Sequence, residues 1–221
     1  MALDPQYRAF LEKNSGYFPN FDNFLNAFKT LSREDTHAIL FGQDPYPREK
    51  SAIGYAFIDG MVDELFSDKG FSTRVNRATS LRNFLKMQLI AEGYLKQDDV
   101  SQEAIAKVDK STFISSITDL KENFEANGIL LLNTALIFTC KEESKNHVKA
   151  FMPFMETLMR YIAGDKKELI LFGAMAKSVE KLLPFGHSYT LTKTVHPYNV
   201  SFISDENVQV YFGRMQLLQK R

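Results

Sequence analysis

The stretch HAILFGQDPYPREKSAIGYAF, residues 37–57, decides how the rest of the chain is interpreted. It begins with an apolar run that is typical of a short buried strand and then breaks into GQDPYP at residues 42–47. Asp44 is therefore a carboxylate on a proline-containing turn directly after a strand. Such a turn limits the freedom of the side chain, and catalysis depends on preorganised groups, although an aspartate also commonly caps a turn.

Short apolar segments recur along the chain and alternate with segments of helical spacing. GILLLN (128–133), KELILFG (167–173) and SYTLTKTV (188–195) join HAILFG as expected strands. This alternation favours an α/β domain with a mostly parallel sheet. The expected helices are two within residues 5–31, one over 80–92 with Ser80 as its cap, one over 150–163, one over 174–183 and a closing helix over 206–220, with helices and connections over 96–127.

Polar residues follow three of the expected strands. Asp44, Asn133 and His196 each come just past an apolar run. In parallel sheets, ligands bind outside the carboxyl ends of the strands. We therefore expect these three side chains on one rim of the sheet.

The composition excludes several other classes of site. The 221 residues suit one domain, and 27 Lys and Arg balance 27 Asp and Glu, so no global charge indicates a nucleic-acid partner, although a local basic face can exist. Cys140 is the single cysteine, which excludes an internal disulfide and a Cys-x-x-Cys metal cluster. Because the sequence has no basic-then-apolar leader and no apolar run of about 18 residues, we expect a cytoplasmic protein without membrane contact.

The ordered motifs GQDPYP, GYAF, GILLLN, LILFGAMAK and VHPYNVS resemble family 1 uracil-DNA glycosylases over roughly residues 17–215. That family carries Gly-Gln-Asp-Pro-Tyr-His, Gly-Leu-Ala-Phe-Ser, Leu-Leu-Leu-Asn and His-Pro-Ser-Pro-Leu-Ser. The resemblance implies a single domain, residues 1–221, with a three-layer αβα fold around a central, mostly parallel four-stranded sheet. It also implies a monomeric DNA repair enzyme that flips uracil out of single- or double-stranded DNA, hydrolyses its N-glycosidic bond and needs no cofactor or metal.

The chemistry of this bond assigns roles to two of the matched residues. Breaking the bond develops positive charge on the sugar and negative charge on the departing base. Asp44 would stabilise the sugar cation and orient a water molecule. His196 would donate a hydrogen bond to the uracil oxygen where charge builds up, whereas His147, near the family's Ser-His, is a weaker match.

Four residues are expected to bind the uracil. Asn133 offers both a donor and an acceptor, which suit the N3–H and O4 edge of uracil but not the same edge of cytosine. Phe57, thirteen residues after Asp44, would stack on the base. By resemblance, Tyr46 would fill the space that thymine's methyl group needs, and Gln43 would contribute main-chain contacts.

The positions expected to contact DNA depart from the family pattern. Ser80 and Ser201 match serines that touch phosphates, but Pro47 stands where the family has a His. Val200 stands where the family's leucine wedges into the duplex. Losing one methylene forfeits about 0.8 kcal/mol of apolar burial, so we expect weaker action on duplex DNA and a preference for single strands.

Two other interpretations stay open at this point. One is a catalytically weak DNA-binding or replication accessory module on the same fold, an idea that Pro47 supports. The joint presence of Asp44, Asn133 and His196 argues against it, because a pure binding module has no use for all three. The other is a glycosidase of free nucleosides, against which the phosphate-contacting serines argue only weakly.

Overall fold

The computed structural model describes residues 3–162 and 166–221, and these residues separate into two units. The first unit comprises residues 1–59 and 128–193, and the second comprises residues 60–127 and 194–221. Residue 163, the expected last residue of one helix, lies outside the described part of the chain. None of the described helices has the length and apolarity to cross a membrane.

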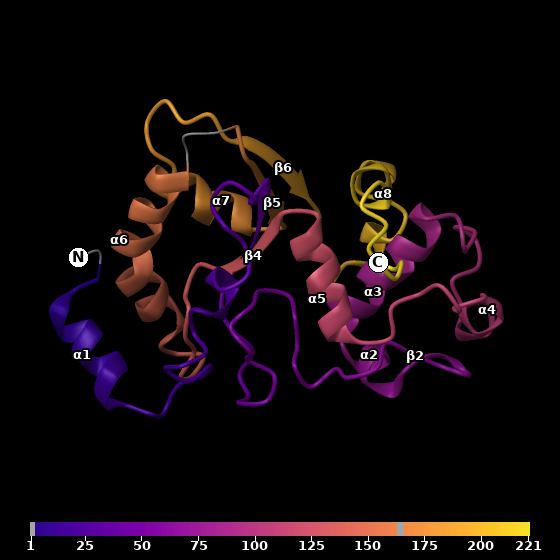
Figure 1. Ribbon diagram of the computed structural model, residues 1–221, viewed down its shortest axis with the longest axis horizontal. Helices are drawn as coiled ribbons and strands as arrows, with labels where there is room; N and C mark the ends of the chain where they lie inside the picture. The colour runs from indigo at the N-terminus through magenta and orange to yellow at the C-terminus, as the bar shows by residue number, and fades with distance from the viewer. Residues whose placement is uncertain (1–2, 163–165) are drawn as a thin grey trace. The chain divides into compact units, whose positions relative to one another are not determined.

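A four-stranded sheet lies at the centre of the first unit, with the strand order β4-β1-β5-β6 (Figure 1). Strand β1 pairs in parallel with both β4 and β5. The fold prediction, an α/β protein with helices flanking a mostly parallel four-stranded sheet, is confirmed. The strands are β1 (Ala38–Gly42), β4 (Ile129–Asn133), β5 (Glu168–Phe172) and β6 (Thr190–Thr194), which are the four segments expected from the sequence.

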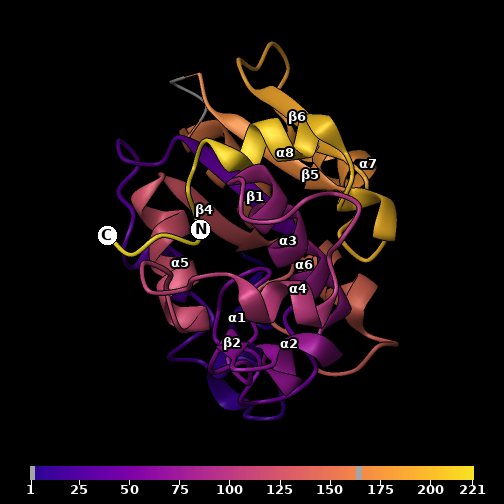
Figure 2. The same ribbon diagram turned by 90° about the vertical axis from the view of Figure 1, so that its right-hand side faces the viewer.

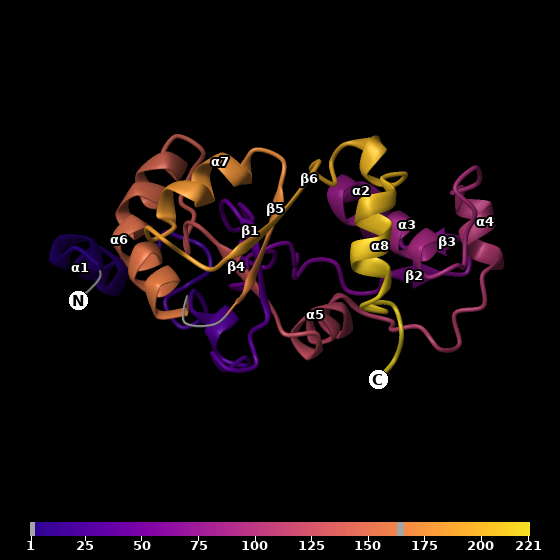
Figure 3. The ribbon, with the colours of Figure 1, turned by 90° about the horizontal axis from the view of Figure 1, so that it is seen from above.

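Alternate residues of the sheet build the core of this unit, because successive side chains of a strand point to opposite faces. The register places Ile39 opposite both Leu130 and Leu169, so the three side chains form one apolar row. Helix α6 lies between α1 and the sheet (Figure 3). The helical elements of the unit are α1 (Pro5–Lys13), η1 (Asn26–Phe28), α6 (Ser144–Ile162), α7 (Met175–Val179) and η2 (Glu180–Leu182).

Helix α6 begins six residues before the expected start at residue 150. Its buried residues Phe151, Met155 and Met159 recur every fourth position, which is the apolar stripe that the sequence predicts. The first turns are polar in sequence but carry two buried side chains, Ser144 and His147. Tertiary contacts, not apolar periodicity, therefore define where this helix starts.

The second unit is mainly helical, and helices α3 and α8 pack side by side (Figure 1 and Figure 2). Phe84 on α3 lies with its ring centroid 5.1 Å from that of Phe212, 5.8 Å from that of Phe124 and 6.2 Å from that of Phe202. The elements are β2 (Phe66–Ser67), β3 (Gly70–Phe71), α2 (Thr73–Arg77), α3 (Thr79–Ala91), α4 (Gln102–Lys107), α5 (Ile117–Ala126), η3 (Val200–Phe202) and α8 (Glu206–Gly213).

Several expectations at the ends of helices were wrong. Ser80 does not cap α3: Ala78 occupies the cap position, because the chain turns there directly from α2 into α3. The second expected helix within residues 5–31 is only the short η1. The closing helix stops at Gly213, after which Gln219 forms a bridge with Phe113. The hairpin β2–β3 and helix α2 were not predicted, since neither is long enough to show a periodic pattern.

The Phe84→Ala substitution should destabilise the protein by about 3–5 kcal/mol, because it empties the centre of the phenylalanine cluster. Chemical denaturation followed by circular dichroism would measure this loss. The control Val210→Ala removes an exposed side chain of α8 (76% exposed) and should change the stability by less than about 0.5 kcal/mol. Equal stabilities of the two variants would contradict the central role of the cluster.

Candidate active site

Hydrogen bonding between β1 and β4 continues past the ends of both strands. Gly42 lies opposite Asn133 in the register. The backbone N–H of Thr134 then donates to Gly42 O (2.9 Å), and that of Ala135 donates to Gln43 O (2.9 Å). The turn that carries Asp44 and the loop that follows Asn133 are therefore held together at the carboxyl ends of β1 and β4. The sequence predicts this shared position for the two residues.

The two carboxylate oxygens of Asp44 have different surroundings. Oδ2 accepts hydrogen bonds from Ser144 Oγ (2.6 Å) and Gln43 Nε2 (2.8 Å). Oδ1 is buried and has no hydrogen-bond partner among the residues that the structure describes. Leaving such an oxygen unsatisfied is unfavourable, so Oδ1 is suited to a partner other than the residues that the structure describes.

Ser144 is a contact of Asp44 that the sequence interpretation missed. It is buried (7% exposed) at the start of α6, a hundred positions away along the chain. The available signal was the resemblance around His147, which points to a serine and a histidine near the site. That resemblance did not single out Ser144, because the segment around it, CKEESKN at residues 140–146, is polar and has no periodic pattern.

Asn133 is buried (5% exposed) at the carboxyl end of β4, and a glycine makes room for its amide. A Cβ atom on Gly42 would lie 2.2 Å from Asn133 Oδ1, which is far inside van der Waals contact. Gly42 therefore allows the amide to lie against the neighbouring strand. This backbone approach explains why the apolar run of β1 ends in glycine.

Phe57 has a strained backbone, with φ at 67° in the left-handed region that non-glycine residues seldom adopt. Its carbonyl accepts a hydrogen bond from the Tyr46 hydroxyl (3.2 Å), and its ring makes a T-shaped contact with the ring of Phe172 at a centroid distance of 6.0 Å. Burial, assisted by the charge of Asp59, raises the pKa of Tyr46, so this hydroxyl stays a donor. Two of the residues expected to bind uracil thus contact each other directly.

His147 lies on the same helix as Ser144, but its ring nitrogens contact Tyr7 and Thr139. Its Nδ1 is 2.7 Å from the Tyr7 hydroxyl and its Nε2 is 2.8 Å from Thr139 Oγ1. Burial lowers the pKa of His147 against the opposing influence of the Glu143 and Asp44 charges. The residue joins α1 to α6, and these contacts support a structural role.

His196 belongs to the second unit, where its own loop orients the ring. The backbone N–H of Tyr198 donates to His196 Nδ1 (3.0 Å), so the proton of the neutral ring lies on Nε2. Although the residue is exposed, partial desolvation of the ring lowers the pKa of His196 and favours this neutral form. In this neutral form Nε2 is the nitrogen that carries the hydrogen-bond donor.

The positions expected to contact DNA lie on exposed or half-buried turns. Pro47 and Ser201 are exposed, Ser80 is half-buried in the first turn of α3, and Val200 is 75% exposed. The loop before Val200 is anchored from within the second unit, where Asn83 Nδ2 donates to the carbonyl of Pro197 (2.8 Å). Val200 thus presents an exposed apolar side chain from a backbone segment that this hydrogen bond holds in place.

The described residues contain no group of three His, Cys, Asp or Glu side chains that could hold a metal ion. The functional groups that the candidate residues offer are carboxylate, amide, imidazole and aromatic side chains. Within the first unit, a preorganised carboxylate and a buried amide suit the stabilisation and recognition of a substrate whose charge changes during reaction.

Known uracil-DNA glycosylases match the chain along most of its length. The proteins named uracil-DNA glycosylase from Lactococcus lactis subsp. cremoris and Fusobacterium nucleatum are each 26% identical to it, over 84% and 86% of this chain and 79% and 70% of their own lengths. No family model matches the chain. The crystal structure of mimivirus uracil-DNA glycosylase shares the fold, with a TM-score of 0.57 and 18% identity over 87% of this chain and 60% of that one.

A much nearer match comes from the wild-type UNG crystal structure of Nitratifractor salsuginis. It is 50% identical to this protein and superposes with a TM-score of 0.97, over 100% of this chain and 88% of that one. A sequence identity of this size over the full chain, together with the ordered motifs and the shared three-layer α/β fold, shows that the chain belongs, as a divergent member, to the uracil-DNA glycosylase family.

Proposed function

We propose that this protein hydrolyses the N-glycosidic bond between uracil and deoxyribose in DNA, releasing uracil and leaving an abasic site for base excision repair. The observation that carries the proposal concerns Asp44, which follows β1 where Asn133 ends β4: its Oδ1 is buried and has no hydrogen-bond partner in the described part of the chain. Membership of the family supports the same activity.

In this proposal Asp44 and His196 act on opposite charges. As the bond between sugar C1′ and uracil N1 breaks, its electron pair leaves with the base and the sugar becomes cationic. Asp44 stabilises the cation and orients the water that adds to C1′. His196 donates from Nε2 to the uracil oxygen that gains negative charge, an interaction worth roughly 3 kcal/mol of barrier height.

The remaining residues of the first unit would select the base. Asn133 would pair with the N3–H and O4 edge of uracil, and Phe57 would stack on the ring at roughly 1–3 kcal/mol. Tyr46 would occupy the space of thymine's methyl group. The hydrogen bond from the Tyr46 hydroxyl to the Phe57 carbonyl supports a shared pocket wall. Gln43 contributes its main chain, and its side chain also contacts Asp44.

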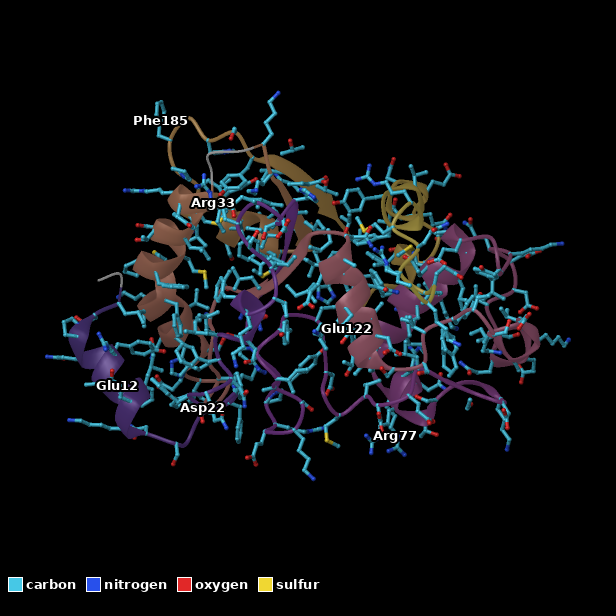
Figure 4. The ribbon with its side chains drawn as sticks, viewed as in Figure 1. Glu12, Asp22, Arg33, Arg77, Glu122 and Phe185 are labelled. Carbon is cyan, nitrogen blue, oxygen red and sulfur yellow. The ribbon has the colours of Figure 1, made fainter. Side chains whose placement is uncertain are left out.

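DNA contact is assigned to Pro47, Ser80, Val200 and Ser201, with single- or double-stranded uracil DNA as the partner. Hydroxyls position a DNA backbone without reading its sequence. Exposed cations of the second unit are available for phosphates, and Arg77 projects outward from α2 (Figure 4). No cofactor, metal or membrane has a role in this proposal, and a single-domain, monomeric, cytoplasmic state stays a prediction.

Incubating the purified protein with a single-uracil oligonucleotide, followed by alkali, should produce strand scission at the uracil. The Asp44→Asn variant should be slower by roughly 10²- to 10⁴-fold, because it removes the charge that supports the sugar cation. Binding of uncleaved DNA without any scission would instead identify a binding module. Cleavage of free deoxyuridine but not of the oligonucleotide would identify a nucleoside glycosidase.

The Gly42→Ala substitution should lower the rate of uracil release by roughly 100-fold, because the new Cβ displaces the Asn133 amide and a shift of about 1 Å is enough for such a loss. The matched control is Gly16→Ala, where a Cβ would meet no atom within 4 Å. Single-turnover rates of the two variants provide the measurement. If Gly42→Ala were as active as Gly16→Ala, Asn133 would not read the base from this position.

The Val200→Leu substitution should raise the activity on duplex DNA relative to single strands by roughly fourfold, the equivalent of one added methylene. Val210→Leu is the control, since Val210 is exposed to nearly the same degree (76% against 75%) but lies on α8. The measurement is the ratio of kcat/KM on duplex DNA to kcat/KM on single-stranded DNA for each variant. Equal wild-type rates on both substrates, unchanged in Val200→Leu, would refute the single-strand preference.

A further inference from the structure

The backbone of the turn around Asp44 supplies none of the hydrogen bonds that hold its carboxylate. Pro45 and Pro47 have no backbone N–H to donate, and the Tyr46 hydroxyl donates to the carbonyl of Phe57. Both hydrogen bonds to Asp44 Oδ2 come from side chains, one from the preceding Gln43 and one from Ser144 on α6. The turn-capping alternative for Asp44 therefore has no support from these contacts.

Ser144, Gln43 and Asp44 form a closed set of hydrogen bonds. The Ser144 hydroxyl has one hydrogen, which it gives to Asp44 Oδ2 at 2.6 Å. Its oxygen accepts from Gln43 Nε2 at 3.3 Å, while the same amide donates to Oδ2 at 2.8 Å. Ser144 is buried and Gln43 is exposed, so the serine is the better-defined of the two donors.

The position of Ser144 is itself set by the packing of the first unit. The loop that leads into α6 is held by two backbone hydrogen bonds between Phe18 and Phe138, of 2.8 and 2.7 Å. From this loop α6 continues into its buried stripe, which begins at Phe151. A donor on a packed helix costs little further ordering when substrate binds, and this is the condition for effective positioning.

We propose that Ser144 is the positioning residue of Asp44. By holding Oδ2, it leaves Oδ1 as the oxygen that faces the sugar cation and the attacking water. This assignment rests on the proposed glycosylase function and adds to it a residue on α6 and a separate task for each carboxylate oxygen. It also accounts for the unequal surroundings of the two oxygens, since the described residues place two donors on Oδ2 and none on the buried Oδ1.

The Ser144→Ala variant should lower kcat for uracil release by roughly 10- to 100-fold, the scale of one hydrogen bond to a charged group. KM should be unchanged, because in this proposal the buried Ser144 acts through Asp44 and makes no contact with the DNA. Ser144→Thr and Ser144→Val introduce side chains of the same shape, so a difference in activity between them reports the hydroxyl and not the packing. The threonine variant, which keeps the hydroxyl, should retain most of the activity, whereas the valine variant should behave like Ser144→Ala.

The decisive comparison repeats Ser144→Ala in an Asp44→Asn background. A residue that acts only through the Asp44 carboxylate should then change kcat by less than about twofold, because coupled residues are not additive. The control is Thr157→Ala, which removes an exposed hydroxyl of the same helix whose hydrogen bond goes to the carbonyl of Pro153. Melting temperatures identify any variant that loses activity by unfolding.

The outcomes separate this proposal from the function on which it rests. An inactive wild-type protein would overturn both. An active wild type with Ser144→Val as active as Ser144→Thr would overturn the positioning role alone. So would an increase in KM without a change in kcat, or an equal loss from Ser144→Ala in the wild-type and Asp44→Asn backgrounds.

Discussion

The pairing of β1 with β4 is the constraint on which the rest of the first unit depends. Because the parallel register places Gly42 opposite Asn133, the hydrogen bonding can run on to Thr134 and Ala135. These backbone hydrogen bonds fix the main chain next to Asp44 and Asn133 independently of their side chains. A shift of one residue would turn every side chain of β1 to the opposite face of the sheet, so the apolar core and the polar site share one register.

The candidate site contains unfavourable local geometry that neighbouring contacts stabilise. Phe57 has a positive φ, which is unfavourable for a residue with a side chain, yet its carbonyl is held by the Tyr46 hydroxyl. One oxygen of Asp44 accepts hydrogen bonds, whereas the other is buried and finds no partner among residues 3–162 and 166–221. Such local departures from the most stable arrangement are typical of functional sites, where the surrounding packing maintains a geometry suited to a ligand.

The sequence predicted the parts of the fold that have strong local patterns. The four sheet strands are continuous apolar or alternating runs, so their positions could be read directly, and the stripe of α6 from Phe151 onward was equally clear. The start of α6 at Ser144 could not be read, because the buried hydroxyl and imidazole of its first turns lie in a polar segment. The prediction that Ser80 caps α3 was wrong for a related reason, because the turn from α2 into α3 places Ala78 at the cap position.

The sequence by itself indicated the family and the strand-ending glycine, and it predicted Asp44, Asn133 and His196 as site residues, because these follow from residue types at fixed positions along a chain. Only the tertiary structure decided which groups hold Asp44. Ser144 is a hundred residues away, and its contact depends on how a loop and a helix pack onto the sheet. The same holds for the proton of His196, which lies on Nε2 because the backbone of Tyr198 folds back to donate to Nδ1.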